Sequence, residues 1–342
     1  MKKVLLTGIS GFVGQHCAVQ LLENGYAVRG SIRNLSKEQE VRKGIAKVID
    51  AKDNLEFCEL DLSSDKGWDK AMEGCEYVLH VASPFVIAEP KDENEMIKPA
   101  VEGTLRALNA AKKAGIKKVV LTSSAVAMAG DKKKNHLTQE SWTDAKTDKV
   151  SAYMKSKTLA ERAAWDFYNN QTAGNKMELT VVNPGPIYGP TLTGNLTGAS
   201  MSMIKDIITG KMPMLPNAHY VMSDVRDIAK IHVAAMENDE SNGKRFIVTS
   251  EKMYSFVGIA AILKENGFPK ASPKKAPSFM VKFMSLFNRE MKGMLPFIDA
   301  EISADISPTK EVFNWKPLPF ERTVLDAAKS IEIGRASCRE RV

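Results

Sequence analysis

A tyrosine and a lysine four positions apart, Tyr153 and Lys157, are the side chains of this sequence best placed for acid-base chemistry. They stand at the start of a helix predicted over residues 152–169, and an i to i+4 spacing puts both on one helix face. A phenol with a pKa of about 10 transfers protons poorly at neutral pH, and an adjacent ammonium favours the phenolate. The pair therefore suits proton transfer.

A serine at the end of a predicted strand could complete this pair. Ser124 follows a strand predicted over residues 118–122, and parallel sheets bind ligands at the carboxyl ends of their strands. Its hydroxyl could hydrogen-bond a carbonyl oxygen of a substrate. By itself a Tyr-x-x-x-Lys spacing usually marks a buried tyrosine beside a lysine, so the other motifs decide its meaning.

Three glycines, Gly8, Gly11 and Gly14, stand at three-residue intervals between a strand predicted over 3–7 and a helix predicted over 12–23. Glycine permits a tight turn and a close approach to a pyrophosphate, which the amide groups of a helix N-terminus can bind. Structural turns also use glycine, but the flanking strand and helix favour a dinucleotide. The predicted binding residues of this turn are Gly8, Ser10, Gly11, Phe12, Val13 and Gly14.

The end of the second predicted strand, over residues 27–32, indicates which dinucleotide binds. An acidic side chain there would accept hydrogen bonds from a free ribose 2′-hydroxyl, but residues 29–34 contain none. Arg33 can stack on adenine and bind a 2′-phosphate, and Lys37 can add a second positive charge. The pair predicts NADPH/NADP+, with two exposed cations at a helix start as the structural alternative.

Short apolar segments alternate with amphipathic ones along the first half of the chain, which predicts strands alternating with helices. Continuous apolar strands form a parallel sheet covered on both faces. The expected fold class is α/β, a Rossmann-type doubly wound parallel sheet with a smaller C-terminal substrate-capping domain. The predicted strands cover 3–7, 27–32, 55–60, 77–81, 118–122 and 178–182, and the predicted helices 12–23, 37–49, 66–72, 93–114 and 152–169.

The pattern changes after Pro184 into loops rich in Gly, Pro, Thr and Asn that are mixed with helices. We predict an NADP-binding domain over residues 1–183 and a mainly substrate-binding, capping region over 184–331, with returns to the first domain near 221–249. Residues 332–342, EIGRASCRERV, look like a translated sequencing adapter and are left out of the fold prediction.

The composition argues against several classes of protein. The 342 residues are 44% hydrophobic, enough for a globular core, and no apolar run approaches the about 20 residues of a membrane span, so no membrane association is expected. The formal charge of +7 comes from scattered lysines without interleaved aromatic residues, so no nucleic-acid partner is expected. Four cysteines without paired spacing predict reduced thiols, no metal site and a cytoplasmic location.

Seven motifs together resemble the extended short-chain dehydrogenase/reductases of the NAD-dependent epimerase/dehydratase superfamily. The sequence is similar to the branch of dihydroflavonol reductases, cinnamoyl-CoA reductases and yeast methylglyoxal/aldehyde reductases, over roughly residues 3–329. The motifs are TGISGFVG at 7–14, Asp61-Leu62, HVASP at 80–84, TSS at 122–124, YMKSK at 153–157, NPGPIYGP at 183–190 and DVRD at 224–227.

This resemblance implies a role for each matching position. Ser124, Tyr153 and Lys157 would be the catalytic triad, and Arg33 with Lys37 would bind the 2′-phosphate. As structural alternatives, an aspartate after a strand can cap a helix and a proline can end a strand. Further cofactor contacts are implied for Asp61 and Leu62 beside adenine, for Val81, Ala82, Ser83 and Thr122 along the dinucleotide, and for Pro184, Gly185 and Ile187 at the nicotinamide carboxamide.

The resemblance also implies the reaction, reduction of an aldehyde, ketone or dicarbonyl to the alcohol by hydride transfer, with proton donation from Tyr153. A small to medium, largely apolar carbonyl substrate is the expected partner, in a pocket that includes Phe85, Ala129 and Tyr188. Plant dihydroflavonol reductases carry a polar side chain that reads the substrate where this chain has Ala129, so a flavonoid is not expected.

Several points stay open at this stage. A segment rich in methionine and phenylalanine, residues 279–297, would cap the pocket, or would be a core helix or a contact between subunits. The chain would be a monomer or a homodimer. Two other functions on the same fold are an NAD-dependent nucleotide-sugar epimerase or dehydratase, and a non-catalytic regulator that senses NADP.

Overall fold

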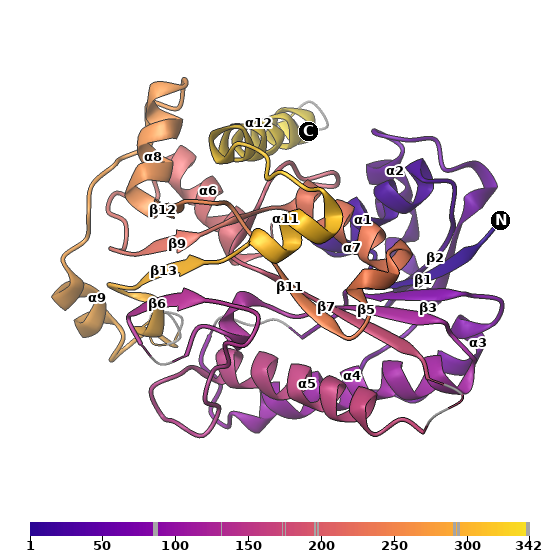
Figure 1. Ribbon diagram of the computed structural model, residues 1–342. Coiled ribbons are helices and arrows are strands. Elements are labelled where there is room, and N and C mark those ends of the chain that lie inside the picture. The colour runs from indigo at the N-terminus through magenta and orange to yellow at the C-terminus, as the bar shows by residue number, and fades with distance from the viewer. Residues whose placement is uncertain are drawn as a thin grey trace.

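A seven-stranded sheet forms the centre of the computed structural model, which describes residues 1–84, 88–130, 132–172, 174, 176–194, 196, 198–289, 292 and 295–339 (Figure 1). Its order is β11-β7-β5-β4-β1-β2-β3, and its paired strands are parallel. The Rossmann-type sheet predicted from the sequence is confirmed. The strands are β1 (Lys3–Thr7), β2 (Ala27–Ile32), β3 (Leu55–Glu59), β4 (Tyr77–His80), β5 (Lys118–Thr122), β7 (Glu178–Pro184) and β11 (Lys244–Val248).

The strand order places a ligand site between β1 and β4. From β1 the chain first builds outward to β3, then returns to β4 and builds in the opposite direction. The loops after β1 and β4 therefore leave the sheet on opposite faces and open a crevice at the carboxyl ends of the strands. The glycine turn follows β1, and Ser124 follows β5 at the same edge.

Helices cover both faces of this sheet because successive strand residues point to opposite sides. In β1, Val4 and Leu6 pack into one apolar layer and Leu5 packs into the other. Helices α1, α2 and α7 lie on the first side, and α3, α4 and α5 lie on the second, with α4 and α5 side by side (Figure 1). These helices are α1 (Phe12–Glu23), α2 (Glu38–Ile45), α3 (Trp68–Met72), α4 (Asn94–Lys113), α5 (Ala152–Asn169) and α7 (Val225–Glu237).

A smaller set of elements sits beside the carboxyl edge of the main sheet (Figure 1). It has a four-stranded sheet in the order β12-β9-β13-β6 and a short parallel pair, β8 with β10. Its strands are β6 (Lys134–Leu137), β8 (Ile187–Tyr188), β9 (His219–Val221), β10 (Ser223–Asp224), β12 (Met253–Ser255) and β13 (Glu301–Ala304). Its helices are α6 (Ala199–Thr209), α8 (Phe256–Glu265), α9 (Ser278–Met284) and α12 (Phe320–Arg339), whereas α11 (Ser307–Phe313) packs against β11 of the main sheet and against α7.

Most predicted elements agree with the structure to within two residues at each end, and two segments differ more. The helix expected over 37–49 is a 3₁₀ turn, Leu35–Lys37, followed by the shorter α2. Residues 134–137, where no strand or helix was predicted, form strand β6, which is polar except for Leu137 and pairs with the distant β13. Among the helices of the described residues, none is both long and apolar enough to cross a lipid bilayer.

Candidate active site

The turn between β1 and α1 has room only for glycine at two positions. Gly8 has a φ of +71°, and a Cβ on it would lie 2.9 Å from the Cα of Ala82. A Cβ on Gly14 would lie 2.2 Å from the carbonyl oxygen of Gly8. Because Gly8 and Gly14 have no side chains, α1 can start directly behind the end of β1. This places the N-terminus of α1 where it can approach a pyrophosphate.

The N-terminus of α1 fits an anionic ligand. Its N-cap is Gly11, which offers no side chain to the first amide groups, and its first turn contains no acidic residue. Uncapped amide groups at a helix start carry partial positive charge and can donate to phosphate oxygens. Gln15 steadies the turn by donating to the carbonyl of Ser10 at 3.0 Å. The backbone here suits the pyrophosphate of a dinucleotide.

The side chains expected to bind the 2′-phosphate lie on the surface after β2. Arg33 and Lys37 are both exposed, and Lys37 Nζ forms an ion pair with Glu40 at 2.9 Å. Asp61 follows the neighbouring strand β3, and hydrogen bonds from Ser63 lower its pKa, with a smaller contribution from Arg33. Arg33 and Asp61 thus lie on one rim of the crevice, at the ends of adjacent strands.

Thr7 and His80 fix the end of β4 against the glycine turn. The Thr7 hydroxyl accepts a hydrogen bond from the Ala82 amide at 3.0 Å and lies 2.9 Å from Nδ1 of His80. Burial lowers the pKa of His80 to about 4, with a smaller effect of the charge on Lys157, so the ring is neutral at pH 7. A neutral Nδ1 can accept the Thr7 hydroxyl proton, which holds Ala82 beside Gly8.

Helix α5 begins immediately before Tyr153. Ser151 is its N-cap, and the Ser151 hydroxyl accepts a hydrogen bond from an amide of the first turn at 3.4 Å. The Ala152 amide donates to Oε1 of Glu89 at 3.1 Å. Tyr153 therefore lies in the first helical turn, where its side chain hydrogen-bonds that of Ser124.

Burial dominates the acidity of this tyrosine. It raises the pKa of Tyr153 to about 12, and the hydrogen bond to Ser124 opposes this only in part. The sequence suggested a phenol shifted toward phenolate by a neighbouring ammonium, whereas loss of solvation is the larger effect. The phenol is therefore protonated at neutral pH, which is the form that a proton donor requires.

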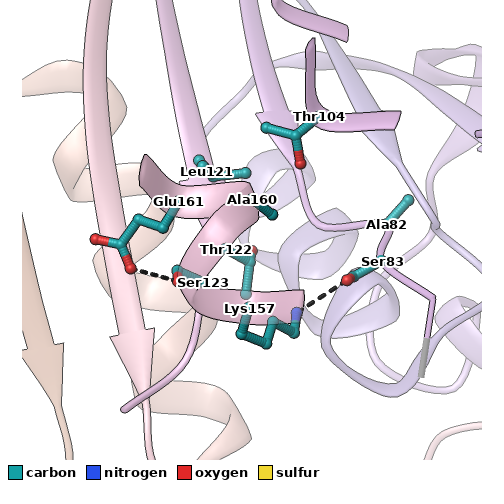
Figure 2. A pocket seen from close by; sticks show the side chains of 9 residues that line it. All are labelled: Ala82, Ser83, Thr104, Leu121, Thr122, Ser123, Lys157, Ala160 and Glu161. Carbon is teal, nitrogen blue, oxygen red and sulfur yellow. Dashed lines mark hydrogen bonds between the residues drawn. The ribbon is translucent and has the colours of Figure 1, made fainter. Parts of the chain in front are cut away.

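Lys157 follows one turn later on α5 and is buried. Its Nζ donates to Oγ of Ser83 at 2.9 Å, which joins α5 to the loop after β4 (Figure 2). Burial lowers the pKa of Lys157 to about 8, and the nearby carboxylate of Glu161 opposes this shift. The structure thus pairs Tyr153 with Ser124 and, one helical turn later on α5, Lys157 with Ser83.

Thr122 turns its hydroxyl toward the helical layer. Its Oγ1 lies 2.6 Å from Nε2 of His232, whose Nδ1 lies 2.8 Å from the carbonyl of Ile228. Burial lowers the pKa of His232 to about 4, so the ring is neutral and carries one proton. Nδ1 donates to the carbonyl, and Nε2 accepts from Thr122. The Thr122 hydroxyl therefore donates its proton to a hydrogen bond with His232 and not to a bound cofactor.

The end of β7 is packed as closely as the glycine turn. A Cβ on Gly185 would lie 2.6 Å from the carbonyl oxygen of Val221, and the Gly185 amide donates to Oγ of Ser223 at 2.9 Å. This packing leaves Pro184 buried and Gly185 half-buried at the edge of the crevice. The other predicted cofactor residues lie half-buried around the strand ends: Ser10, Phe12, Val13, Leu62, Val81, Ala82, Ser83 and Ile187.

Of the three residues expected to line a substrate pocket, one is buried in the core and one is half-buried near the site. Tyr188 is fully buried, its ring packs edge-to-face against Phe320, and its hydroxyl bonds to Ser200. It is therefore a core residue, and we leave it out of the proposed site. Ala129 is half-buried beyond the end of β5. Phe85 lies outside the described residues.

Three buried polar residues behind the site received no role from the sequence, although one of them, Asn183, begins the motif at 183–190. Glu161, Asn183 and Arg245 are all buried and interact with one another through the Glu161 carboxylate. Only Glu161 could have been noticed from the sequence, because it stands one helical turn after Lys157 on the same helix. The contacts themselves join α5, β7 and β11, and no local pattern predicts such a cluster.

The strand order and the glycine turn define a dinucleotide-binding α/β protein of the Rossmann type. Residues 4–249 match the NAD dependent epimerase/dehydratase family, and the chain belongs to this family. The resemblance inferred from the seven motifs is confirmed.

Named relatives cover most of the chain. A cinnamoyl-CoA reductase of Medicago truncatula is 34% identical over 269 residues, which are 77% of this chain and 80% of the relative. An NADPH-dependent methylglyoxal reductase of Saccharomyces cerevisiae is 30% identical over 335 residues, 90% of this chain and 96% of the relative. The crystal structure of yeast methylglyoxal/isovaleraldehyde reductase complexed with NADPH matches with a TM-score of 0.82 at 26% identity, over 98% of this chain and 99% of that one.

Proposed function

We propose that this protein is an NADPH-dependent carbonyl reductase that converts an aldehyde, ketone or dicarbonyl to the alcohol. The observation that carries the proposal is the hydrogen bond between Tyr153 and Ser124 beside the buried Lys157. It places a protonated phenol and a hydroxyl at the carboxyl ends of parallel strands, where such sheets bind ligands. The reductases among the relatives support this reaction over epimerisation of a nucleotide sugar.

In this mechanism bound NADPH supplies the hydride that adds to the carbonyl carbon. Ser124 orients the carbonyl oxygen by a hydrogen bond, and Tyr153 transfers its proton to that oxygen as negative charge develops there. Lys157 stabilises the phenolate left on Tyr153 and holds the nicotinamide ribose. Ser83, which accepts a hydrogen bond from Lys157 Nζ at 2.9 Å, fixes the ammonium between β4 and α5.

The cofactor would lie along the carboxyl edge of the sheet. The uncapped N-terminus of α1 would bind the pyrophosphate, and Asp61 with Leu62 would flank adenine. Residues 81–83 would line the dinucleotide, and residues 184–187 would hold the carboxamide of the nicotinamide. Arg33 and Lys37 would bind the 2′-phosphate as charge-assisted donors.

The direct test is an assay of the purified full-length protein with NADPH. A panel of aldehydes, ketones and dicarbonyls should oxidise NADPH, as followed by its absorbance, while UDP-sugars should not be converted. Turnover of a UDP-sugar without net NADPH oxidation would favour the epimerase function instead. Tight NADPH binding without turnover of any substrate would favour a sensor.

The first prediction concerns cofactor preference. Replacing Arg33 and Lys37 together by alanine should lower kcat/KM for NADPH by about 10- to 100-fold, because two charge-assisted contacts to the 2′-phosphate are lost. The value for NADH, which lacks this phosphate, should change little. Lys43→Ala, which removes another exposed cation from α2, should leave both values near those of the wild type. Equal kcat/KM for the two cofactors in the wild type would contradict the assignment.

The second prediction concerns the substrate, which we propose is small to medium and largely apolar. The methionine- and phenylalanine-rich segment reaches the start of α5, because the Glu89 amide donates to the carbonyl of Arg289 at 3.2 Å and the Glu89 carboxylate binds Ala152. This segment exposes Phe279 and Phe283, which are 72% and 63% accessible. Flexible apolar side chains of this kind accept varied apolar shapes.

Uncharged aldehydes and ketones should therefore have higher kcat/KM than matched carboxylated or CoA-linked compounds. Lys282 and Arg289 lie in the same segment and would favour the charged series if they bound substrate. A hundredfold preference for charged substrates, about 2.7 kcal/mol in transition-state binding, would overturn the apolar assignment.

A further inference from the structure

A carboxylate with no place in the chemistry above lies buried behind the site. Glu161 is one helical turn beyond Lys157 on α5 and is only 1% exposed. Removing a carboxylate from water is strongly unfavourable unless charged and hydrogen-bonding partners replace the solvent. The partners of Glu161 are Ser123, Trp165, Asn183 and Arg245.

Two of these partners sit at the ends of the strands that carry the site. Glu161 Oε2 accepts a hydrogen bond from Ser123 Oγ, drawn in Figure 2, and another from Nδ2 of Asn183 at 2.7 Å. Ser123 directly precedes Ser124 after β5, and Asn183 directly precedes Pro184 at the end of β7. Nδ2 of Asn183 also donates to the carbonyl of Ser124 at 3.2 Å. One carboxylate thus joins both strand ends to α5.

Arg245 balances the charge of this carboxylate from β11. Its Nη2 lies 2.7 Å from Oε1 of Glu161, and both side chains are buried. The guanidinium also stacks on Trp142, 3.9 Å from the ring centroid, and donates to the carbonyl preceding Trp142 at 2.8 Å. The position of the arginine is therefore fixed, and it holds Oε1 while Oε2 binds the strand ends.

We propose that Glu161 is a positioning residue of the reductase. Through Ser123 and Asn183 it sets the ends of β5 and β7 against α5, so that Ser124 stays within hydrogen-bonding distance of Tyr153. This inference rests on the proposed function and adds a group that acts without touching substrate or cofactor. Displacement of reacting groups by about 1 Å can lower a rate about 100-fold, so such a support has a measurable effect.

Glu161 also acts on the charge of Lys157. Burial lowers the pKa of Lys157 to about 8, and Glu161 opposes this shift. The charge on Lys157 is also felt by His80 from β4, which is neutral, while Tyr153, one turn earlier on α5, is protonated at neutral pH. The carboxylate therefore helps to keep Lys157 an ammonium at pH 7, the form in which it can stabilise a phenolate.

Glu161→Gln tests both effects, because glutamine keeps the shape but turns an amide group toward one set of hydrogen-bond donors. We expect kcat for an aldehyde to fall about 100-fold, while the Kd for NADPH changes less than about threefold. The alkaline limb of the kcat profile should move to lower pH, since Lys157 loses its proton earlier without the opposing charge. Glu161→Asp keeps the negative charge, so the alkaline limb of its kcat profile should lie at the wild-type pH. Its kcat should remain below that of the wild type, because the shorter side chain cannot make all the hydrogen bonds of Glu161.

Thr180→Val is the matched control for loss of buried hydrogen bonding. The Thr180 hydroxyl donates to the carbonyl of Ser241 at 2.8 Å, at the opposite end of β7 from Asn183. This variant should lower Tm and leave kcat and its pH profile unchanged. A folded Glu161→Gln variant with kcat within about threefold of the wild type, or an equal loss in Thr180→Val, would overturn the proposal.

A separate readout distinguishes this proposal from the proposed function. If the wild type binds NADPH but reduces no carbonyl, the reductase function fails, and the fluorescence emission of bound NADPH then tests the positioning role. The emission should change in Glu161→Gln and stay at the wild-type value in Thr180→Val, because only the first variant releases the strand end beside the nicotinamide. Identical emission from both variants would refute the role of Glu161.

Discussion

Tyr153→Phe should reduce kcat by at least about 1000-fold while NADPH still binds with nearly unchanged affinity. The variant removes one hydroxyl, whose proton is the one we propose is transferred to the carbonyl oxygen, and general acids contribute about 100- to 10,000-fold to rates. The phenol ring is half-buried and would keep its packing, and Ser124 retains its hydrogen bond from the amide of Val126 at 3.3 Å. Single-turnover oxidation of NADPH and a fluorescence titration measure the two quantities separately.

Tyr168→Phe provides the matched control on the same helix. The hydroxyl of Tyr168 donates to Oε2 of Glu178 at 2.8 Å, near the end of α5 that lies farthest from Tyr153. Its loss should reduce stability by about 1 kcal/mol and leave kcat unchanged. Substantial turnover by Tyr153→Phe would move the proton donor elsewhere and reopen the epimerase and sensor alternatives.

The elements that carry the site could be predicted to the residue because their signals are local. Strands β1, β2 and β5 and helices α1 and α5 begin and end where the sequence pattern placed them. Each has its own apolar run or amphipathic repeat, and the two helices begin at a glycine turn and at a capping serine. The candidate triad lies at the end of β5 and the start of α5, two of these elements.

Features that depend on distant segments could not be predicted in this way. Strand β6 is polar and exists because it pairs with β13, which lies more than a hundred residues later in the sequence. Tyr188 stands in a motif next to predicted cofactor residues, yet packing against Phe320 places it in the core. The shift of the Tyr153 pKa also differs from the expectation, since spacing on a helix carries no information about solvation.

The second large effect is expected at Lys157, where activity and stability should change in opposite directions. Lys157→Met should lower kcat about 1000-fold, because no ammonium remains to stabilise the phenolate on Tyr153. The same change should stabilise the fold at pH 7. Burial lowers the pKa of this lysine from its ordinary value of 10.5 to about 8, which means that the folded protein holds the charge at a free-energy cost.

The size and sign of this stability change follow from the pKa. A shift from 10.5 to about 8 corresponds to about 3 kcal/mol at pH 7, where the lysine is charged in both the folded and the unfolded chain. The lost hydrogen bond to Ser83 offsets about 1 kcal/mol, which leaves a net gain of about 2 kcal/mol for Lys157→Met. Between pH 8 and 10.5 the folded protein releases the proton first, so the gain should disappear as the pH rises through this range.

Urea unfolding of the wild type and Lys157→Met at pH 7 and at pH 10 tests this directly. The free energy of unfolding of the variant should exceed that of the wild type at pH 7, and the difference should shrink at pH 10. Lys155→Met is the control, because Lys155 Nζ is already compensated by Glu93 at 2.7 Å, so its removal should not stabilise the fold and should leave kcat near that of the wild type. A Lys157→Met variant that is inactive and less stable than the wild type at pH 7 would show that the lysine stabilises the fold. The proposal that the buried ammonium lowers stability while it supports activity would then be wrong.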